Sequence, residues 1–239
     1  MSLNPWINRH PEMASIAGNI VISYGEIELR VAMCLGNALG DQDTALRTMF
    51  RIMGETARIG AADALMRAHF GKMKLQDEYA EVMGAVRHCV VLRNHYAHCQ
   101  WADDLHAGVF FTRLDEPAKA SETFAYIWKH IDEPLLAAQW RYMQYAADGL
   151  DFLNFEYLLR IGKRRQNAFP MPLKQQKPKP HSPLGEHIPP WLNPADRQRH
   201  IKHAQESEAG GQKRKSKPRL RKPSQAQKRK SALKSRVDG

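Results

Sequence analysis

The first third of the chain carries apolar residues at steps that place them on one face of a helix. The repeating positions are Ile16, Ile20, Ile27, Val31 and Cys34. They follow one another at steps of about four and seven residues, which is the period of an amphipathic helix. Pro11 suits a first helical turn, and Gly40 with Asp41 ends the pattern. We predict one long helix over residues 11–38.

Two shorter helical segments follow. The first extends to about Met53, with Asp43 or Thr44 as its N-cap, and Gly54 interrupts it. The second covers about residues 56–69. Because the connections are short, we expect consecutive helices to pack antiparallel.

A fourth helix is predicted over residues 75–98. Its inward-facing positions are Tyr79, Val82, Val86, Cys89 and Val90. A fifth begins after Asp132-Glu133-Pro134, an acidic N-cap region followed by an early proline, and extends to about Ile161. Its apolar positions are Leu136, Trp140, Met143, Ala147, Leu150, Leu153 and Tyr157.

Between these two helices the pattern changes to that of strands. Residues 109–114 and 124–128 are rich in β-branched and aromatic side chains, and a polar loop with Pro117 separates them. We interpret them as a small hairpin. The expected fold is therefore all-α, an antiparallel helical bundle of about five helices with a small inserted β-hairpin.

Charge divides the chain into two parts. Residues 1–161 contain 15 Lys and Arg against 20 Asp and Glu, whereas residues 162–239 contain 21 against 5 and most of the prolines. A segment so poor in apolar side chains cannot offset the entropy lost on ordering. We therefore expect a helical domain over residues 1–163 and a disordered, Pro-rich and Lys/Arg-rich tail over residues 164–239.

The three cysteines, Cys34, Cys89 and Cys99, are an odd number, and two of them lie within apolar runs. This number and placement of cysteines suit reduced side chains that pack in the core better than a disulfide framework.

The N-terminus lacks an apolar signal region, and no apolar stretch is long enough to cross a bilayer. We expect a cytoplasmic protein with no membrane association.

The most informative motif is Arg93-Asn94-His95-Tyr96-Ala97-His98 near the end of the fourth helix. Arg followed by His after a short gap recurs at Arg197 and His203, but only Arg93 is followed directly by Asn and, five positions on, by His. The motif combines a fixed cation, an amide and an imidazole, which are groups suited to cleaving RNA without a metal. On an ideal helix, Arg93 and His98 lie about 140° apart, a gap that the long arginine side chain partly closes.

In the context VVLRNHYAHCQW, which we interpret as a buried helix entering a turn, the motif resembles the HEPN superfamily of small α-helical domains. The resemblance covers roughly residues 11–161 in element order and is motif-specific over residues 90–101. It implies a metal-independent ribonuclease whose active site is composed at the two-fold axis of a homodimer. In that mechanism, His98 is the general base or acid and Arg93 stabilises charge on phosphorus. Asn94 positions the phosphate or the histidine.

A structural interpretation competes with this one. A histidine in the last helical turn also interacts with unpaired carbonyl groups, and an arginine on an inner face often pairs with a buried acid. Glu28, between Tyr24 and Val31 on the first helix, is an expected partner that would aim Arg93, or else an ordinary structural acid. We include Glu28 among the candidate catalytic residues.

Neither a metal nor a cofactor is expected. His88, Cys89, His95, His98 and Cys99 lack a CxxC pair, and His95 and Cys99 lie on a different helical face from His98. No Gly-rich phosphate loop or Gly-x-Ser-x-Gly elbow is present.

The tail is the expected nucleic-acid-binding segment, because clustered cations neutralise phosphates without reading sequence. The candidate residues are Lys213, Arg214, Lys215, Lys217, Arg219, Arg221, Lys222, Lys228, Arg229 and Lys230. The alternative is a tail that only keeps the protein in solution.

We therefore predict an endoribonuclease that cleaves RNA by 2′-OH attack. The competing class is a non-catalytic dimerisation or interaction module with a nucleic-acid-tethering tail. The sequence leaves open the RNA substrate, the choice between a toxin and phage defence, and a restraining antitoxin or other regulatory protein.

Overall fold

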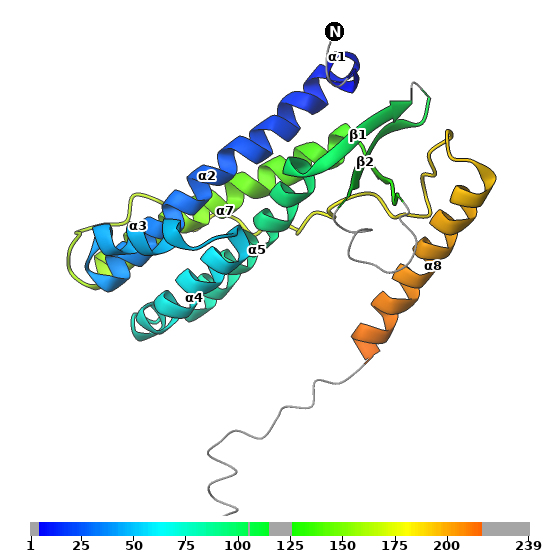
Figure 1. The fold of residues 1–239 in the computed structure, drawn as a ribbon. Coiled ribbons are helices and arrows are strands. Elements are labelled where there is room, and N and C mark those ends of the chain that lie inside the picture. Colours follow the sequence, from blue (N-terminus) through cyan, green and yellow to red (C-terminus); the bar gives the residue numbers. More distant parts are fainter. Residues whose placement is uncertain (1–4, 105, 115–125, 217–239) are drawn as a thin grey trace, which may run out of the picture.

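The computed structural model describes residues 5–104, 106–114 and 126–216, and within this part the chain is mostly helical with one small sheet (Figure 1). The helices are α1 (Trp6–Arg9), α2 (Pro11–Leu39), α3 (Gln42–Arg51), α4 (Glu55–Lys72), α5 (Gln76–Ala97), α7 (Glu133–Arg160) and α8 (Pro194–Ser216). The strands are β1 (Cys99–Asp104), β2 (Gly108–Arg113) and β3 (Lys129–Ile131). All five helices expected from the apolar pattern are present within a few residues of their predicted bounds.

Local chemistry sets the helix ends. Gly40 adopts the left-handed conformation that stops α2, with φ of 75°. The N-cap of α3 is Asp41, whose carboxylate accepts from the Thr44 backbone N–H at 3.0 Å; the prediction of Asp43 or Thr44 as cap was wrong. Asp132 caps α7 in the expected way by accepting from the Leu135 N–H.

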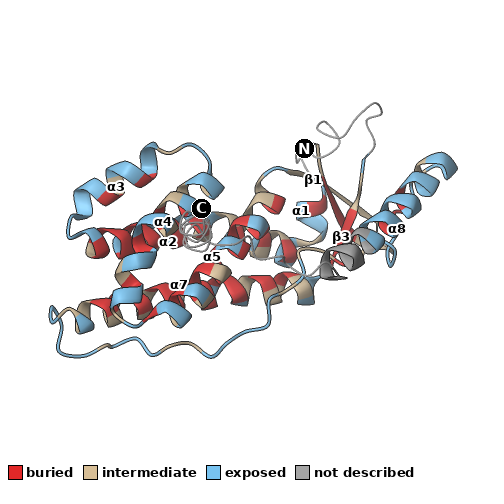
Figure 2. Cartoon of the chain, turned by 90° about the horizontal axis from the view of Figure 1, so that it is seen from below, coloured by how far each residue is buried: buried red, intermediate tan, exposed pale blue. Residues whose placement is uncertain are grey.

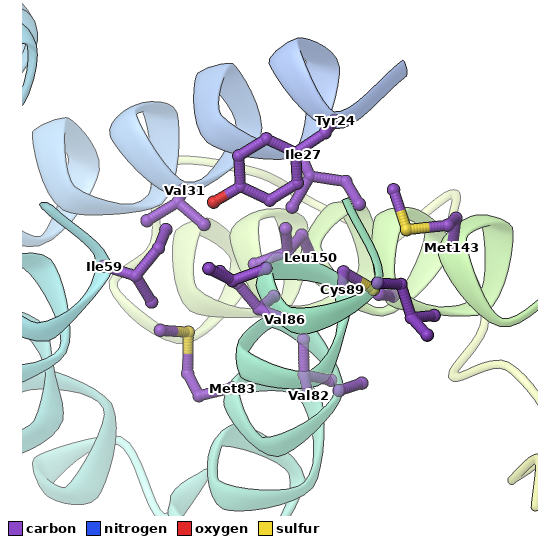
Figure 3. Packing of buried hydrophobic residues seen from close by; sticks show 14 of the residues in the cluster. Tyr24, Ile27, Val31, Ile59, Val82, Met83, Val86, Cys89, Met143 and Leu150 are labelled. Carbon is purple, nitrogen blue, oxygen red and sulfur yellow. The ribbon is translucent and has the colours of Figure 1, made fainter. Parts of the chain in front are cut away.

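The core lies where α2, α5 and α7 meet, and α4 packs against α2 and α5 (Figures 2 and 3). The chain enters α2, leaves α5 and enters α7 near the sheet, so α5 runs opposite to the other two helices (Figure 1). α5 and α7 approach closely at Gly149, where an added Cβ would lie 2.8 Å from a methyl carbon of Val82. Glycine is required there by space.

The three strands form an antiparallel sheet in the order β1-β2-β3. β2 confirms the first predicted strand. The predicted second strand is wrong in position: residues 126–128 are not in a strand, β3 begins at Lys129, and residues 124–125 lie outside the described part. The hairpin partner of β2 is instead β1, with Trp101 opposite Phe111. The sequence predicts a turn where β1 begins, but Trp101 stacks on Trp6 and Tyr96, and the extended strand gives it these aromatic contacts.

The expectation of disorder from residue 164 onward is wrong for the segment that precedes α8. Residues 162–193, here called the C-terminal segment, follow α7 in extended form and return along it to the sheet (Figure 2). Pro178 and Lys179 accept hydrogen bonds from buried His88 and Gln139, and the Ser182 N–H donates to the His130 carbonyl at 2.9 Å. These bonds link the segment to the core and compensate for its few apolar side chains.

α8 is amphipathic only over a short stretch. His200 and Ala204 are buried, and His200 Nε2 lies 2.8 Å from the Trp128 carbonyl oxygen. Residues 217–239, where the prediction of a disordered tail also applies, lie outside the described residues. No described helix combines the length and apolar character needed to span a membrane.

Candidate functional site

The motif residues meet at the end of α5 that adjoins the sheet. Arg93 Nη1 donates to Asn94 Oδ1 at 2.9 Å and lies 3.4 Å from His98 Nε2. His98 is the C-cap of α5, with φ of −127° and ψ of 24°, so it no longer follows the helical period. This departure brings the imidazole to the arginine, despite the separation expected on an ideal helix. Since His98 is exposed, the site is open to solvent.

The acidic partner of Arg93 comes from α4. Glu55 Oε1 lies 2.7 Å from Arg93 Nη1, and the two side chains retain 26% and 21% exposure. Arg93 also lies over the Tyr24 ring, with its Cζ 6.0 Å from the ring centroid. The guanidinium is thus held between α2, α4 and α5 by one carboxylate and one aromatic face.

Glu28 does not pair with Arg93, and the predicted contact between them is wrong. Both carboxylate oxygens of Glu28 accept from Arg58 Nη1 at 2.7 Å. Arg58 Nη2 also donates to the Ile52 carbonyl, and its guanidinium lies over the Phe50 ring. Because Arg58 is only three residues after Glu55 on α4, one helix supplies partners for both α2 and α5.

Tyr24 lies between the two ion pairs. Its hydroxyl is buried and has no hydrogen-bond partner among the residues that the structure describes. Burial, followed by the negative charges of Glu28 and Glu55, raises the pKa of Tyr24 well above its usual range. The hydroxyl therefore remains protonated at physiological pH.

His95, although inside the motif, faces away from Arg93. Its ring lies 5.8 Å from Phe111 and 6.4 Å from His181, and it is buried. Burial is the main cause that lowers the pKa of His95 to about 3, with nearby positive charges adding to the effect. The imidazole is neutral at pH 7 and belongs to the packing between α5, the sheet and the C-terminal segment.

The cysteines are packing residues with weakly acidic thiols. Cys34, Cys89 and Cys99 are free thiols that form no disulfide within the described part of the chain. Burial raises the pKa of each thiol to about 12. Within residues 5–104, 106–114 and 126–216, no three His, Cys, Asp or Glu side chains form a group that could hold a metal ion.

The predicted nucleic-acid-binding residues divide between two regions. Lys213, Arg214 and Lys215 belong to α8, and the structure describes their backbone as helical. The remaining candidates are Lys217, Arg219, Arg221, Lys222, Lys228, Arg229 and Lys230, which lie outside the described residues.

Sequence reasoning missed Glu55, Arg58 and Tyr24. Glu55 and Arg58 occupy the first turn of α4, where an acid is common because it interacts with the helix dipole. That position gave no sign that Glu55 would meet Arg93, 38 positions later in the chain. Only the packing of α4 against α2 and α5 creates the contact.

Comparison with known proteins adds no relative: no family model, curated protein or solved structure matches the chain. The chemistry of the site therefore has to be inferred from its own groups. Arg93 supplies a guanidinium group, and His98 supplies an exposed ring nitrogen beside it. Such a pair can bind a phosphodiester and transfer a proton.

Proposed function

We propose that the protein is a metal-independent endoribonuclease with a helical bundle of the HEPN type. The observation that carries this proposal is the approach of Arg93 Nη1 to within 3.4 Å of His98 Nε2, at an exposed helix end where Asn94 also contacts the arginine. An arginine and an imidazole at this separation can contact the same phosphodiester group.

The proposed reaction begins with attack of a ribose 2′-oxygen on the adjacent phosphorus. The 2′-hydroxyl proton passes to the imidazole of His98 as the new P–O bond forms. The P–O5′ bond then breaks, and the 5′-oxygen takes a proton from an imidazolium group, His98 itself or His98 of a second copy across a dimer axis. Arg93 stabilises the charge that develops on the phosphoryl oxygens, and Asn94 orients the arginine. The products are a 2′,3′-cyclic phosphate and a free 5′-hydroxyl.

A second candidate function is a non-catalytic dimerisation or interaction module whose basic tail tethers nucleic acid. The ion pair between Arg93 and Glu55 favours it, because the arginine already has a carboxylate partner at 2.7 Å. In this alternative, Arg93 links α5 to α4, and His98 serves as the C-terminal residue of α5.

An RNA-cleavage assay distinguishes the endoribonuclease from the non-catalytic module. We expect the purified protein to cleave RNA in EDTA, to leave a 2′,3′-cyclic phosphate end, and to leave DNA intact because DNA lacks the attacking hydroxyl. His98→Ala and Arg93→Ala should each reduce cleavage by about a hundredfold or more. His106→Ala and Arg87→Ala are matched controls, since both residues are exposed and lie outside the cluster. Loss of activity in EDTA, or equal cleavage of 2′-deoxy substrates, would refute the mechanism, and absence of cleavage by folded wild type would favour the interaction module.

A further inference from the structure

A second polar surface lies between α7 and the C-terminal segment. It is a groove of about 450 Å³ whose lining includes Arg141 from α7 and Gln175, Gln176, Lys177 and Lys179 from the segment. None of these residues belongs to the cluster around Arg93. The groove forms only because the C-terminal segment returns along α7 (Figure 2).

The backbone of the segment is fixed at the groove. Buried Gln139 donates from Nε2 to the Lys179 carbonyl at 2.7 Å, and His88 Nε2 lies 2.9 Å from the Pro178 carbonyl oxygen. Lys174, just before the lining residues in the chain, pairs with Glu81 on α5 at 3.0 Å. Because the hydrogen bonds near Lys177 and Lys179 involve backbone carbonyls, the two ammonium groups remain available while their Cα positions are held.

The groove carries positive charge without a compensating acid. Arg141, Lys177 and Lys179 line it, and no Asp or Glu of the described residues does. Within the described part of the chain, none of these three cations takes part in an ion pair. Burial, followed by the positive charge of Lys177, lowers the pKa of the nearby His88 to about 4.

We propose that this groove binds the phosphodiester backbone of RNA, where the choice of RNA over DNA rests on the proposed function. Lysine and arginine contact phosphate oxygens, and the primary amides of Gln175 and Gln176 donate to phosphate or ribose. A protein partner is less suited to the surface, because protein interfaces rely on buried aromatic or large apolar residues. The apolar lining here consists of Leu135, Ala138 and Pro178.

The groove would hold RNA at a fixed place on the fold, in addition to the non-specific attraction that the sequence predicts for the clustered cations of the tail. A prearranged set of cations loses less side-chain and backbone entropy on binding than an unfolded basic segment does. The groove recognises the backbone and not the bases, so it would hold many RNA sequences. It does not depend on Arg93 or His98, so binding can be measured whether or not the protein cleaves RNA.

The test measures binding of a labelled 2′-O-methyl RNA to the full chain at several salt concentrations. This probe keeps the phosphates and lacks the attacking hydroxyl. The groove variant combines Arg141→Gln, Lys177→Gln and Lys179→Gln. The matched control combines Lys72→Gln, Lys163→Gln and Arg165→Gln, which removes the same charge from three exposed positions outside the groove.

We expect the groove variant to bind about tenfold or more weakly at low salt. Its slope of log K against log salt should fall by about two, roughly 0.7 for each phosphate that is no longer neutralised. The control should change affinity by about twofold or less. Equal weakening in the two triple variants would overturn the proposal, because binding would then follow total charge. Displacement of the RNA by poly-glutamate as effectively as by unlabelled RNA would overturn the assignment to a phosphodiester. Circular dichroism of both variants checks that the helices remain.

Discussion

Arg93 and Glu55 form an ion pair at 2.7 Å that joins the motif on α5 to the first residue of α4. The carboxylate occupies a position that a phosphate oxygen would take on the same guanidinium. A phosphodiester bound by Arg93 must therefore replace Glu55 or share the guanidinium with it.

Glu55→Gln should strengthen the binding of RNA at Arg93. Removal of the competing carboxylate is expected to raise affinity for a 2′-O-methyl RNA by about twofold to fivefold, the equivalent of a partly exposed ion pair. Glu26→Gln, on an exposed position of α2, removes the same charge and serves as the control. A loss of affinity specific to Glu55→Gln would instead show that the carboxylate holds Arg93 in its binding geometry.

Glu28→Gln should affect folding more than Glu55→Gln does. The Glu28 and Arg58 side chains are only 10% and 17% exposed, so the substitution leaves a largely buried cation without its carboxylate. We expect the free energy of unfolding to fall by about 2–4 kcal/mol. Urea unfolding of both variants measures the difference; equal destabilisation would contradict the assignment of Glu28 to structure.

Stability should decrease as the pH falls from about 6.5 to 5. Burial lowers the pKa of His95 to about 3 and that of His88 to about 4, so both remain neutral in the folded chain. In the unfolded chain each imidazole takes up a proton below about pH 6.5, which stabilises the unfolded state. By pH 5 the free energy of unfolding falls by about 2 kcal/mol for each fully buried histidine.

His95→Gln tests this origin of the pH dependence. The variant should retain more of its pH 7.5 stability at pH 5 than wild type does, as measured by urea unfolding at both values. His106→Gln, at an exposed position, should leave the dependence unchanged. Identical pH profiles for His95→Gln and wild type would exclude His95 as a source.

Deletion of residues 217–239 should weaken nucleic-acid binding without reducing stability. The deletion removes nine Lys and Arg residues and one Asp, so the net charge falls from +11 to +3. Affinity for RNA at low salt should fall strongly, and its salt dependence should become less steep. Unchanged affinity and slope would show that this segment makes no contribution to RNA capture. Cleavage at saturating RNA should persist if the chemistry belongs to Arg93 and His98.

Deletion of residues 170–239 should have a different effect, because it removes part of the packed structure. Buried His88 and Gln139 would lose the Pro178 and Lys179 carbonyl groups as hydrogen-bond partners. Each lost hydrogen bond removes about 0.5–1.5 kcal/mol, and the deletion also removes Met171, which packs against the core, so the melting temperature should fall below that of the 217–239 deletion. Equal melting temperatures for the two truncated proteins would mean that the C-terminal segment adds no stability.

The sequence determined the helices of this protein because their signals are local. Apolar residues at the helical period and the stop at Gly40 predicted α2, and the acidic start at Asp132 predicted α7. The meeting of Arg93 with His98 was only partly expected, since an ideal helix places the two about 140° apart and the non-helical backbone at His98 closes the rest of the gap.

Long-range contacts were decided by the tertiary structure. Glu28 and Glu55 were both available acids, and the packing of α4 against α2 and α5 paired Glu28 with Arg58 and left Glu55 for Arg93. The C-terminal segment has the composition of an unfolded chain, yet buried donors on α5 and α7 bind its backbone carbonyls. A prediction from composition considers only the apolar surface of the segment itself. It does not include the unpaired polar groups that the rest of the fold presents to that segment.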